Sequence, residues 1–598
     1  MDFGSIVKNM VSKLFIKFLK IKKMKYIKNI VCIILLFSSV IACDNEDLLK
    51  ETPKDFLSPE NSFTTKAAFE SALARIYGSI RTNFYAQTDN WSNYDMLGID
   101  LDVAQGNDQG NIFSRQTFNW NTFNADNGRV RTWWGRFYRY IFDANVIIGR
   151  AESDVVKWNS EEEKNAVIGE ARFLRAYAYH FLANMWGGVP IILEETTEAR
   201  FDYTRATQEQ VYQQCKEDLE FAVQWMHSID EIKDGMAPRA AAYHTLAEVN
   251  IQLGDYDGAI SAASSVIDGG ELNLMTERFG KYKDFQFNGY DHQGAFEPWG
   301  DVYWDLFRDG NFNRGDGNME TIWNVQFDVA LQGGGNVDVS NNGGYFVIER
   351  WWNPLPWNLR DKNNVSNYLK DTLAGRGVGG SSTQYMAEQV WNYKGDFDRD
   401  IRNSEYNIQR THYWTNPAGE FYGQPITADN VANVNDFNNS RVGPQFMKTT
   451  SAVHYGQFQD ATSKEWHDNG RIYKDYYIMR LAETYLLRAE AHMLNGANGL
   501  AADDINALRN RANATLVDAG DVDIDLILDE RARELHVEEY RLNTLLRTGK
   551  LVEYLNKYHS EIVFNGWTIP DYVNKWPIPN SEIERNSGAE LLQNPGYE

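Results

Sequence analysis

The sequence predicts a mainly α-helical protein in which tetratricopeptide-like helix-turn-helix repeats form a scaffold with a long, loop-rich, aromatic insertion and a few short strands. Two observations predict the scaffold: helical periodicity on both sides of the middle section, and helix pairs that meet at short turns between small residues. A third predicts the insertion, because residues 271–470 are rich in Gly, Asn, Asp, Trp and Tyr and few helices can be placed there.

The first long helix is expected over residues 161–186. Ser160 stands before three glutamates, which favours a helix N-terminus. Apolar residues between Val167 and Leu182 recur every three or four positions, so one stripe should be buried. Two glycines followed by a proline predict where the helix ends.

Further helix pairs are expected along the chain. Residues 238–270 predict two helices that meet at "LGDYDG", and residues 476–513 predict another pair with its turn at 495–499. Residues 206–227 and 525–548 share this periodicity. We therefore expect about four repeat-like pairs, which are not contiguous in the chain.

The insertion is predicted to be ordered and to carry the ligand site. Its "ETIWNVQFDV" alternates like a strand, and most of the rest reads as long loops. Loops of this length in a compact chain are usually functional or disordered, and the many aromatic residues argue against disorder. A rigid scaffold with long loops is a common arrangement for a binding surface.

Residues 1–42 are expected to be a secretory signal, with Cys43 as a lipid anchor. From Met24, the suspected true start, a short basic stretch leads into an apolar run that ends directly before Cys43. That run is shorter than the roughly 20 apolar residues that span a bilayer. The residues Val40-Ile41-Ala42-Cys43 resemble a bacterial lipobox, and the alternative is a chance cysteine in an apolar segment.

The predicted organisation follows these signals. An acidic tether is expected over residues 43–56, an N-terminal helical part over 57–270, the insertion over 271–470 and a C-terminal helical part over 471–598. Although the length alone would allow several domains, residues 57–598 are expected to pack as one compact unit.

Charge and cysteine content exclude some classes of protein. The whole chain carries a formal charge of −24, and loss of residues 1–42, with eight lysines and one aspartate, leaves −31. Nucleic acid is therefore not an expected partner, because phosphate binding depends on clustered Lys and Arg. After removal of Cys32 and acylation of Cys43, only Cys215 remains, so no internal disulfide is expected.

Several long motifs resemble the SusD/RagB family in order and spacing. They include "ARFLRAYAYHFLANMWGGVPI", "RLAETYLLRAEAHMLNG", "ILDERARELHVEEYRLNTLLRTGKL" and the tail "KWPIPNSEIERNSGAELLQNPGYE". The "DFDRDIR" of residues 396–402 is similar to an Asp-Pro-Arg segment of that family, with Ile401 in place of the proline.

The resemblance implies a function and partners. Members are outer-membrane lipoproteins of Bacteroidota that face the outside, capture nutrients, usually glycans, and pass them to a SusC-like TonB-dependent transporter. The acidic residues after Cys43 are similar to the surface-export signal of such lipoproteins. Some relatives act in peptide uptake, so an oligopeptide ligand is the alternative.

The motif arginines are interpreted as structural. They lie on helices rich in apolar and acidic residues, where satisfied ion pairs between repeats are expected. These arginines are Arg172, Arg175, Arg480, Arg488 and Arg533.

The predicted glycan site uses aromatic and hydrogen-bonding residues in loops, because sugar rings present flat C–H faces and vicinal hydroxyls. Three clusters qualify: Trp91, Asn93 and Tyr94; Trp299, Tyr303 and Trp304; and Arg350, Trp351, Trp352, Asn353, Trp357 and Arg360. Core packing is the alternative for any single tryptophan. The third cluster favours ligand contact, because neighbours in an extended chain face opposite ways. Trp133, Trp134 and Trp323 are expected to be structural.

Catalysis is not expected. The sequence has no His-Glu-x-x-His pair and no Gly-x-Ser-x-Gly elbow. A glycosidase needs two carboxylates at a set separation, and with 83 acidic residues such a pair remains open, so a glycan-degrading enzyme is a distant alternative.

No cofactor is expected, apart from a possible structural calcium ion. Asp309, Asn311, Asn313 and Glu320 occupy positions 1, 3, 5 and 12 of a calcium-loop pattern. Arg314 stands where the loop's sharp turn favours glycine, and a strand-like segment follows instead of a helix.

Overall fold

The structure is a computed structural model. It describes Lys13, Met96 and residues 63–86, 99–104, 120–286, 299–332, 334–336, 344–354, 356–367, 380–437, 442–451 and 472–597. The chain from Thr65 to Glu598 forms one compact unit. Apart from Lys13, the predicted signal lies outside the described residues, as do Cys43 and the acidic tether.

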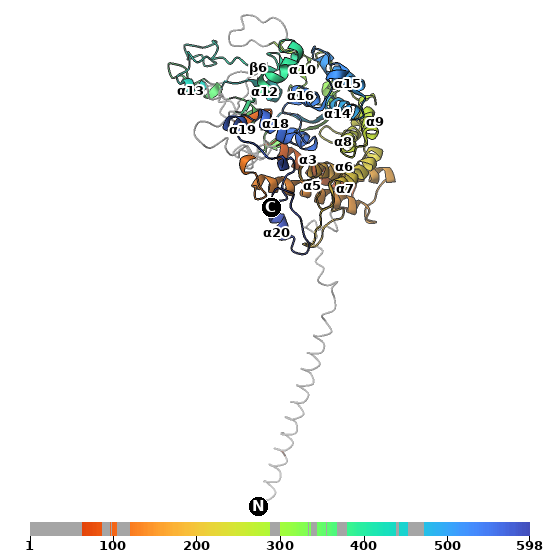
Figure 1. Cartoon of the computed structure of the whole chain (residues 1–598). Coiled ribbons are helices and arrows are strands. Elements are labelled where there is room, and N and C mark those ends of the chain that lie inside the picture. Colours follow the sequence, from red (N-terminus) through yellow and green to blue (C-terminus); the bar gives the residue numbers. More distant parts are fainter. Residues whose placement is uncertain are drawn as a thin grey trace, which may run out of the picture. The chain divides into compact units, whose positions relative to one another are not determined.

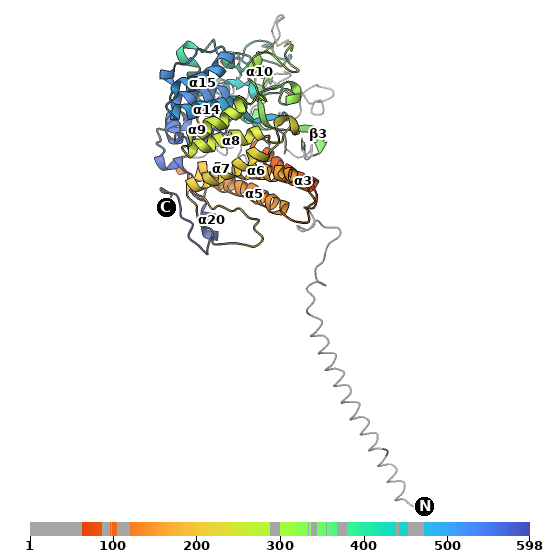
Figure 2. The same cartoon turned by 90° about the vertical axis from the view of Figure 1, so that its right-hand side faces the viewer.

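The long helices pack as one continuous series. Each of α5 to α9 packs against the next, and α9 packs against α14, which also contacts α15 and α16. Figures 1 and 2 show this stack from two sides. Helix pairs that the insertion separates in sequence are thereby joined in space. The helices are α3 (Lys66–Phe84), α5 (Gly128–Ala151), α6 (Glu161–Trp186), α7 (Gln208–Trp225), α8 (Arg239–Gln252), α9 (Tyr256–Ile267), α14 (Leu481–Leu494), α15 (Asn498–Arg511) and α16 (Ile524–Leu535).

Local sequence signals set the ends of these helices. The Ser160 side chain accepts a hydrogen bond from the Glu163 backbone N–H at 3.2 Å and caps α6. At its other end Gly187 adopts φ +76°, a conformation that favours glycine. The helices predicted over 161–186, 206–227 and 238–270 are confirmed.

Two predicted helical segments were partly wrong. Tyr476–Arg480 is not the start of a helix but strand β8, which pairs antiparallel with β2 (Thr321–Val325) and is buried along its whole length. Residues 525–548 form two helices, because Val537 at φ +55° separates α16 from α17 (Arg541–Arg547). In both places contacts between distant segments override the local periodicity.

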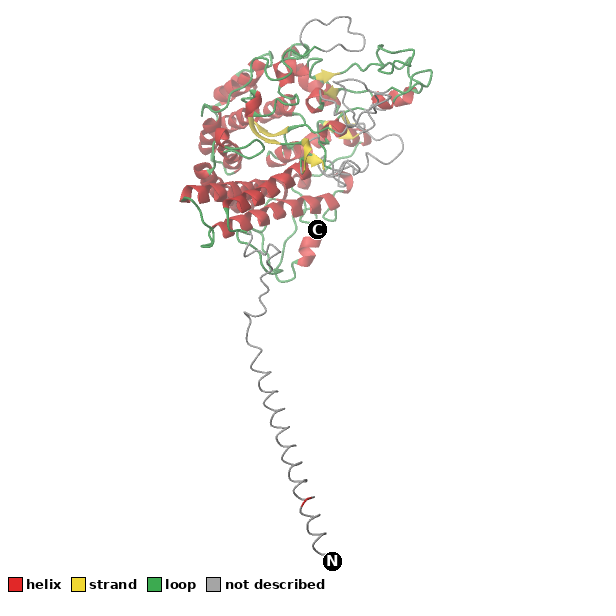
Figure 3. Cartoon of the chain, turned by 180° about the vertical axis from the view of Figure 1, so that it is seen from behind, coloured by secondary structure: helices red, strands yellow, loops and turns green. Residues whose placement is uncertain are grey.

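The other described elements are short, and Figure 3 shows few strands among the helices and loops. The predicted strand in "ETIWNVQFDV" is confirmed as β2, although all five of its residues are buried and do not alternate, and β3 begins at Asp328 near the end of the segment. The remaining strands are β1 (Asp102–Ala104) paired with β5 (Gly380–Ser382), β3 (Asp328–Gln332) paired with β4 (Gly335–Asn336), and β6 (Ile408–Gln409) paired with β7 (Gln445–Phe446). The remaining helices are α10 (Val302–Asp305), α11 (Ile348–Trp352), α12 (Gln384–Ala387), α13 (Val434–Asp436), α18 (Leu551–Tyr558), α19 (Ser560–Asn565) and α20 (Asn580–Arg585).

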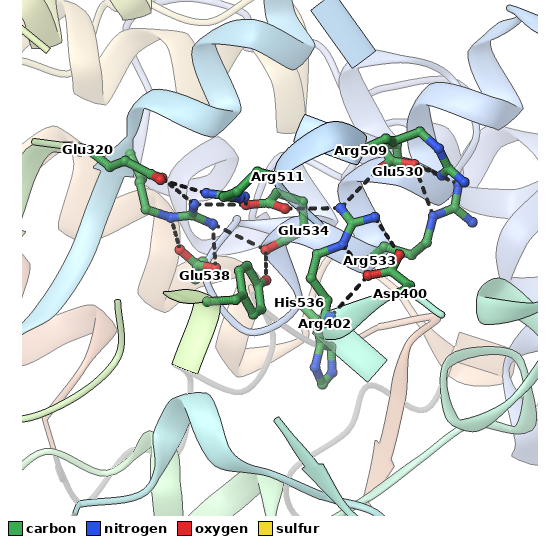
Figure 4. Close-up of polar contacts among 12 residues, drawn as sticks. Glu320, Asp400, Arg402, Arg509, Arg511, Glu530, Arg533, Glu534, His536 and Glu538 are labelled. Atoms are coloured by element: carbon green, nitrogen blue, oxygen red, sulfur yellow. Dashed lines mark hydrogen bonds and ion pairs between the residues drawn. The ribbon is translucent and has the colours of Figure 1, made fainter. Parts of the chain in front are cut away.

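A buried ion network fastens α16 to the insertion and to the helical stack (Figure 4). Glu534 of α16 pairs with Arg402 at 3.0 Å, with Arg480 at 2.8 Å and with Arg511. Glu530, one turn earlier, pairs with Arg402 at 2.8 Å. Burial alone would raise the pKa of Glu534, but the three arginines hold it well below its usual range.

The predicted ion pairs of the motif arginines are confirmed. Arg175 binds Asp218 at 2.7 Å, and Arg172 lies 4.0 Å from the same carboxylate. Arg488 binds Asp504 at 2.7 Å. Arg480 pairs with Glu534 of the same network, and Arg533, labelled in Figure 4, pairs with Glu530. At these positions the motif arginines therefore stabilise the fold through ion pairs.

Candidate functional site

The structure corrects part of the third predicted cluster. Trp352 is 1% exposed and Asn353 is fully buried. The Asn353 amide donates to the Glu349 carbonyl at 2.8 Å and to Thr449 Oγ1 at 3.0 Å. The segment is not extended but forms helix α11, so the argument from alternating side chains does not apply. Neither residue is available to a ligand.

The other members of that cluster differ in what the structure describes. Arg360 is exposed and donates to the Asn364 carbonyl at 2.9 Å. The side chains of Arg350, Trp351 and Trp357 lie outside the described part of the structure, as do Trp91, Asn93 and Tyr94 of the first cluster. Their role as ligand contacts stays a prediction.

In the second cluster, two of the three residues belong to the core. Tyr303 is 1% exposed, and its hydroxyl donates to the Glu534 carbonyl at 2.6 Å. Trp304 is fully buried, with the Arg308 guanidinium 4.5 Å from its ring centre. The prediction of ligand contact was wrong for Tyr303 and Trp304, because α10 turns both rings inward.

Trp299 remains partly exposed and forms an aromatic pair with Tyr406. The ring centres lie 4.8 Å apart at an interplanar angle of 81°, an edge-to-face arrangement. Both side chains are half-buried. Tyr406 was not among the predicted residues, since a lone tyrosine in "NSEYNIQ" carries no sequence signal. We call these two residues the aromatic pair.

Hydrogen bonds fix the two loops that carry the aromatic pair. Asp301, which caps α10, accepts hydrogen bonds from Ser404 Oγ at 3.1 Å and Asn407 Nδ2 at 2.9 Å. It therefore holds the chain next to Trp299 against the chain next to Tyr406. Burial raises the pKa of Asp301, while these hydrogen bonds oppose the shift.

A second set of contacts, made by Arg278, fixes the backbone at Trp299. Arg278 donates to the carbonyls of Trp299 at 3.0 Å and Gly300 at 2.8 Å, and it binds Asp305 at 2.5 Å. Gly300 has φ +99°, and a Cβ there would lie 2.5 Å from the Trp304 ring. The buried Trp304 thus supports the backbone that presents Trp299.

The aromatic pair has the chemistry of a stacking platform. Rigid, half-buried rings can offer apolar area to a sugar face and lose little conformational entropy on binding. The nearby polar groups of Asp301, Asp305 and Arg278 form hydrogen bonds and ion pairs with other residues of the protein. Hydrogen bonds to sugar hydroxyls would therefore come from other side chains, for which the predicted loop residues are candidates.

The remaining predictions on individual residues have clear outcomes. Trp133, Trp134 and Trp323 are at most 5% exposed and structural, as predicted. Glu320, a predicted calcium ligand, binds arginines with its two carboxylate oxygens, Arg480 at 2.8 Å and Arg511 at 2.6 Å. Asn311 donates to the Asp305 carbonyl and accepts from the Lys281 backbone N–H. Within the described ranges no three His, Cys, Asp or Glu side chains gather as a metal site.

Among the residues that the structure describes, no helix combines the length and the apolar character needed to cross a membrane.

Comparison with known proteins gives a consistent picture. A sequence model described as "SusD family" matches residues 303–597, and another, described as "Starch-binding associating with outer membrane", matches residues 55–251. A SusD-like protein of Formosa agariphila is 24% identical over 94% of this chain and 97% of its own length. The starch-binding protein SusD of Bacteroides thetaiotaomicron is 42% identical over 21% of this chain and 22% of its own.

Solved structures share the fold. A laminarin-binding SusD-like protein superposes with a TM-score of 0.61 at 22% identity, covering 89% of this chain and all of the other. A surface glycan-binding protein A of Bacteroides thetaiotaomicron gives a TM-score of 0.62 at 18% identity, with the same coverage of both chains.

Proposed function

The chain belongs to the SusD/RagB family, and from this premise we propose that it captures oligo- or polysaccharides at the cell surface and delivers them to a SusC-like TonB-dependent transporter. A surface glycan-binding role is supported by relatives described as starch-binding and laminarin-binding. Association with the outer membrane is supported by the description of the family model that matches residues 55–251.

The observation that carries this proposal is the aromatic pair. Trp299 and Tyr406 come from loops that are far apart in the chain, and Asp301 holds these loops together. A half-buried tryptophan on a fixed backbone suits a ligand with a flat apolar face, which a pyranose ring offers. The role is binding, without chemical change of the glycan.

The ligand class can be tested with native gels that contain single polysaccharides, beginning with laminarin and starch. The soluble chain that lacks residues 1–43 retains the compact unit from Thr65 to Glu598. Retardation by one polymer, with the polymer recovered intact, is the expected result. Binding of short peptides without any binding of polysaccharides or oligosaccharides would favour the peptide-uptake alternative. Release of shorter glycans would indicate an enzyme.

The membrane anchor has its own test. We expect Cys43 to carry lipid and to hold the protein in the outer-membrane fraction. The Cys43→Ala variant should then appear in the soluble fraction, whereas Cys215→Ala, which changes a buried free thiol, should stay with the membrane. Membrane retention of Cys43→Ala, together with the absence of a lipid label on the wild type, would falsify this anchor.

The transporter partner is tested by purification of the native lipoprotein from outer membranes in mild detergent. A large outer-membrane protein with a TonB box should copurify in a fixed ratio. Recovery of the lipoprotein alone from membranes that contain such a transporter would contradict delivery by a stable complex.

A further inference from the structure

A pocket of about 520 Å³ lies between α5, the segment from Pro190 to Tyr203 and the C-terminal segment from Glu582 to Leu591, which includes part of α20 (Figure 2). None of its lining residues belongs to the aromatic pair. The volume falls within the roughly 300–1,000 Å³ of ligand-binding pockets. The large apolar lining residues are Trp134, Tyr138, Ile141, Phe142, Phe201 and Leu591.

Two walls of the pocket are fixed to each other by hydrogen bonds. The Asn586 side chain accepts from the Tyr203 backbone N–H and donates to the Tyr203 carbonyl, both at 2.8 Å. The Gly588 backbone N–H donates to the Phe201 carbonyl at 2.6 Å. The pocket is therefore preformed, which lowers the entropic cost of filling it.

The interior of the pocket suits an apolar group. The Tyr138 hydroxyl donates to the Pro190 carbonyl at 2.8 Å. Asn145 Nδ2 donates to the carbonyls of Ile192 and Glu194, at 2.9 and 3.3 Å. The hydrogens of these donors are thus already used within the protein. A sugar placed here would leave hydroxyl groups unsatisfied, whereas an apolar chain needs no hydrogen-bond partner.

The charged residues that line the pocket are two arginines and one glutamate, Arg200, Arg585 and Glu582. Both arginine side chains are more than half exposed, which places them at the mouth and not in the interior. Arg585 pairs with Glu582 at 3.0 Å and Arg200 with Asp202 at 3.1 Å. With the described residues, these pairs use only Nη1 of Arg585 and Nε of Arg200, so other N–H donors of both guanidinium groups can reach a ligand.

The helix that forms one wall is also positively charged. α5 contains five arginines and a single carboxylate, Asp143. Asp143 pairs with Arg139 of the same helix at 3.2 Å and also with Arg75 of α3. Of the five arginines, Arg150 pairs with Glu195 at 2.9 Å. The charge at this pocket therefore favours an anionic ligand over a cationic one.

We propose that this pocket binds an anionic amphiphile that consists of a single acyl chain with a carboxylate head group. The acyl chain fills the apolar interior, and the carboxylate at the mouth accepts charge-assisted hydrogen bonds from Arg200 and Arg585. The few polar groups of such a ligand thus meet the exposed donors, and its apolar part meets the rings. This site is separate from the aromatic pair and does not depend on glycan binding.

Three small probes test the proposal by calorimetric titration of the chain that lacks residues 1–43. They are decanoate, decyltrimethylammonium and butyrate, each below the concentration at which it forms micelles. We expect decanoate to bind at least tenfold more tightly than either of the others. Equal binding of decanoate and decyltrimethylammonium would mean that the head group is not recognised, and equal binding of butyrate would mean attraction by charge alone. Either result would overturn the proposal, as would no binding of decanoate.

A membrane lipid is a second source of the same chemistry, and vesicles of phosphatidylcholine with phosphatidylglycerol distinguish it from a free acid. We expect the chain that lacks residues 1–43 to stay in solution when such vesicles are sedimented. Binding to the vesicles without any binding of free decanoate would mean attachment to a lipid surface and would overturn the proposal.

Gly135 provides a variant that fills the pocket. It lines the pocket within α5, and a Cβ added there meets nothing within 4 Å. Gly135→Trp should weaken decanoate binding at least tenfold, while Gly135→Ala should retain it. Gly499→Trp places the same side chain in α15, where a Cβ also meets nothing within 4 Å, and should bind as the wild type does. Because both glycines lie within helices, no loss of thermal stability is expected. Unchanged binding by Gly135→Trp would place the acyl chain elsewhere and overturn the proposal.

The double variant Arg200→Gln/Arg585→Gln tests the recognition of the head group. Its stability should change little, because both arginines form only exposed ion pairs. We expect decanoate to bind at least tenfold more weakly, and decyltrimethylammonium to bind no more weakly than to the wild type. Arg399→Gln changes an exposed arginine that donates to the Asn513 carbonyl and should leave decanoate binding unchanged. Undiminished decanoate binding by the folded double variant would overturn the role of the two arginines and with it the proposal.

Discussion

The helical stack and the loop-rich insertion use the same residue types in different ways. In the stack, arginines pair with carboxylates between helices and aromatic rings fill the core, as Trp133 and Trp186 do. In the insertion, neighbouring tryptophans differ in burial: Trp304 is fully buried and Trp299 is half-buried. In this loop the buried Trp304 and the hydrogen bonds of Arg278 fix the backbone of Trp299, and its ring is only partly buried.

The largest effect is expected in the ion network that joins the two regions. Glu534→Ala leaves Arg402, Arg480 and Arg511 without one of their buried carboxylate partners. The free energy of unfolding should fall by about 3–5 kcal/mol, as when one partner of a buried pair is removed. Urea denaturation followed by circular dichroism measures this.

A surface pair is the control for that variant. Glu582 pairs with Arg585, whose side chain is 71% exposed. Glu582→Ala should cost no more than about 1 kcal/mol. Similar losses for Glu534→Ala and Glu582→Ala would show that the network contributes no more than surface pairs do.

Trp352→Ala is expected to act on stability. Removal of a fully buried indole leaves a cavity and should cost about 3–5 kcal/mol. Trp299→Ala, at a half-buried position, should cost clearly less. Urea denaturation of both variants compares the loss of a fully buried tryptophan with the loss of a half-buried one. A smaller loss for Trp352→Ala than for Trp299→Ala would reverse the assignment of the two residues.

Asp475 links the insertion to β8 and should make stability depend on pH. Burial raises its pKa to about 7, although it accepts hydrogen bonds from the Phe327 backbone N–H and from Asn313. The folded protein keeps this proton up to about pH 7, whereas the unfolded chain releases it near pH 4. The contribution of Asp475 is therefore fully present below pH 4 and is lost as the pH rises through 7.

The Asp475→Asn variant removes this titration. Its free energy of unfolding should rise relative to the wild type by on the order of 2 kcal/mol between pH 5 and pH 8. Urea denaturation at both pH values measures the change, with the exposed Asp429→Asn as a control that should follow the wild type. A pH dependence of Asp475→Asn equal to that of the wild type would mean that Asp475 is ionised in the folded protein at pH 5.

The smallest expected effect, on binding alone, is at the aromatic pair. Trp299→Ala removes one stacking face and should weaken glycan binding roughly tenfold, which corresponds to about 1.4 kcal/mol. Calorimetric titration with the retained polysaccharide measures this. Trp158, another half-buried tryptophan, packs on Phe69 in the helical part, and Trp158→Ala should bind as the wild type does.

Sequence periodicity was sufficient to predict most of the helical stack, because its helices carry apolar stripes and local caps such as Ser160. It failed at Tyr476–Arg480, where pairing with β2 from a distant part of the chain decides the conformation. The motif arginines were predicted to be structural because a charge on an apolar helix needs a partner.

The candidate site was harder to predict. Trp299 and Trp304 are close in sequence, and only the structure shows that Trp304, in α10, is buried while Trp299, before α10, is half-buried. Tyr406 could not be predicted as a partner of Trp299 from the sequence, because only the contacts of Asp301 with Ser404 and Asn407 bring the two loops together. Trp351 and Trp352 were interpreted as neighbours in an extended chain whose side chains face opposite ways. The segment is helix α11 instead, so that interpretation was wrong.

The most direct test of the account is a calorimetric titration of the polysaccharide that native gels select, with the wild type, the double variant Trp299→Ala/Tyr406→Ala and Trp158→Ala. The account predicts that the double variant keeps its fold and loses most of the binding, while Trp158→Ala binds like the wild type. Undiminished binding by the folded double variant would contradict the assignment of the aromatic pair as the glycan platform.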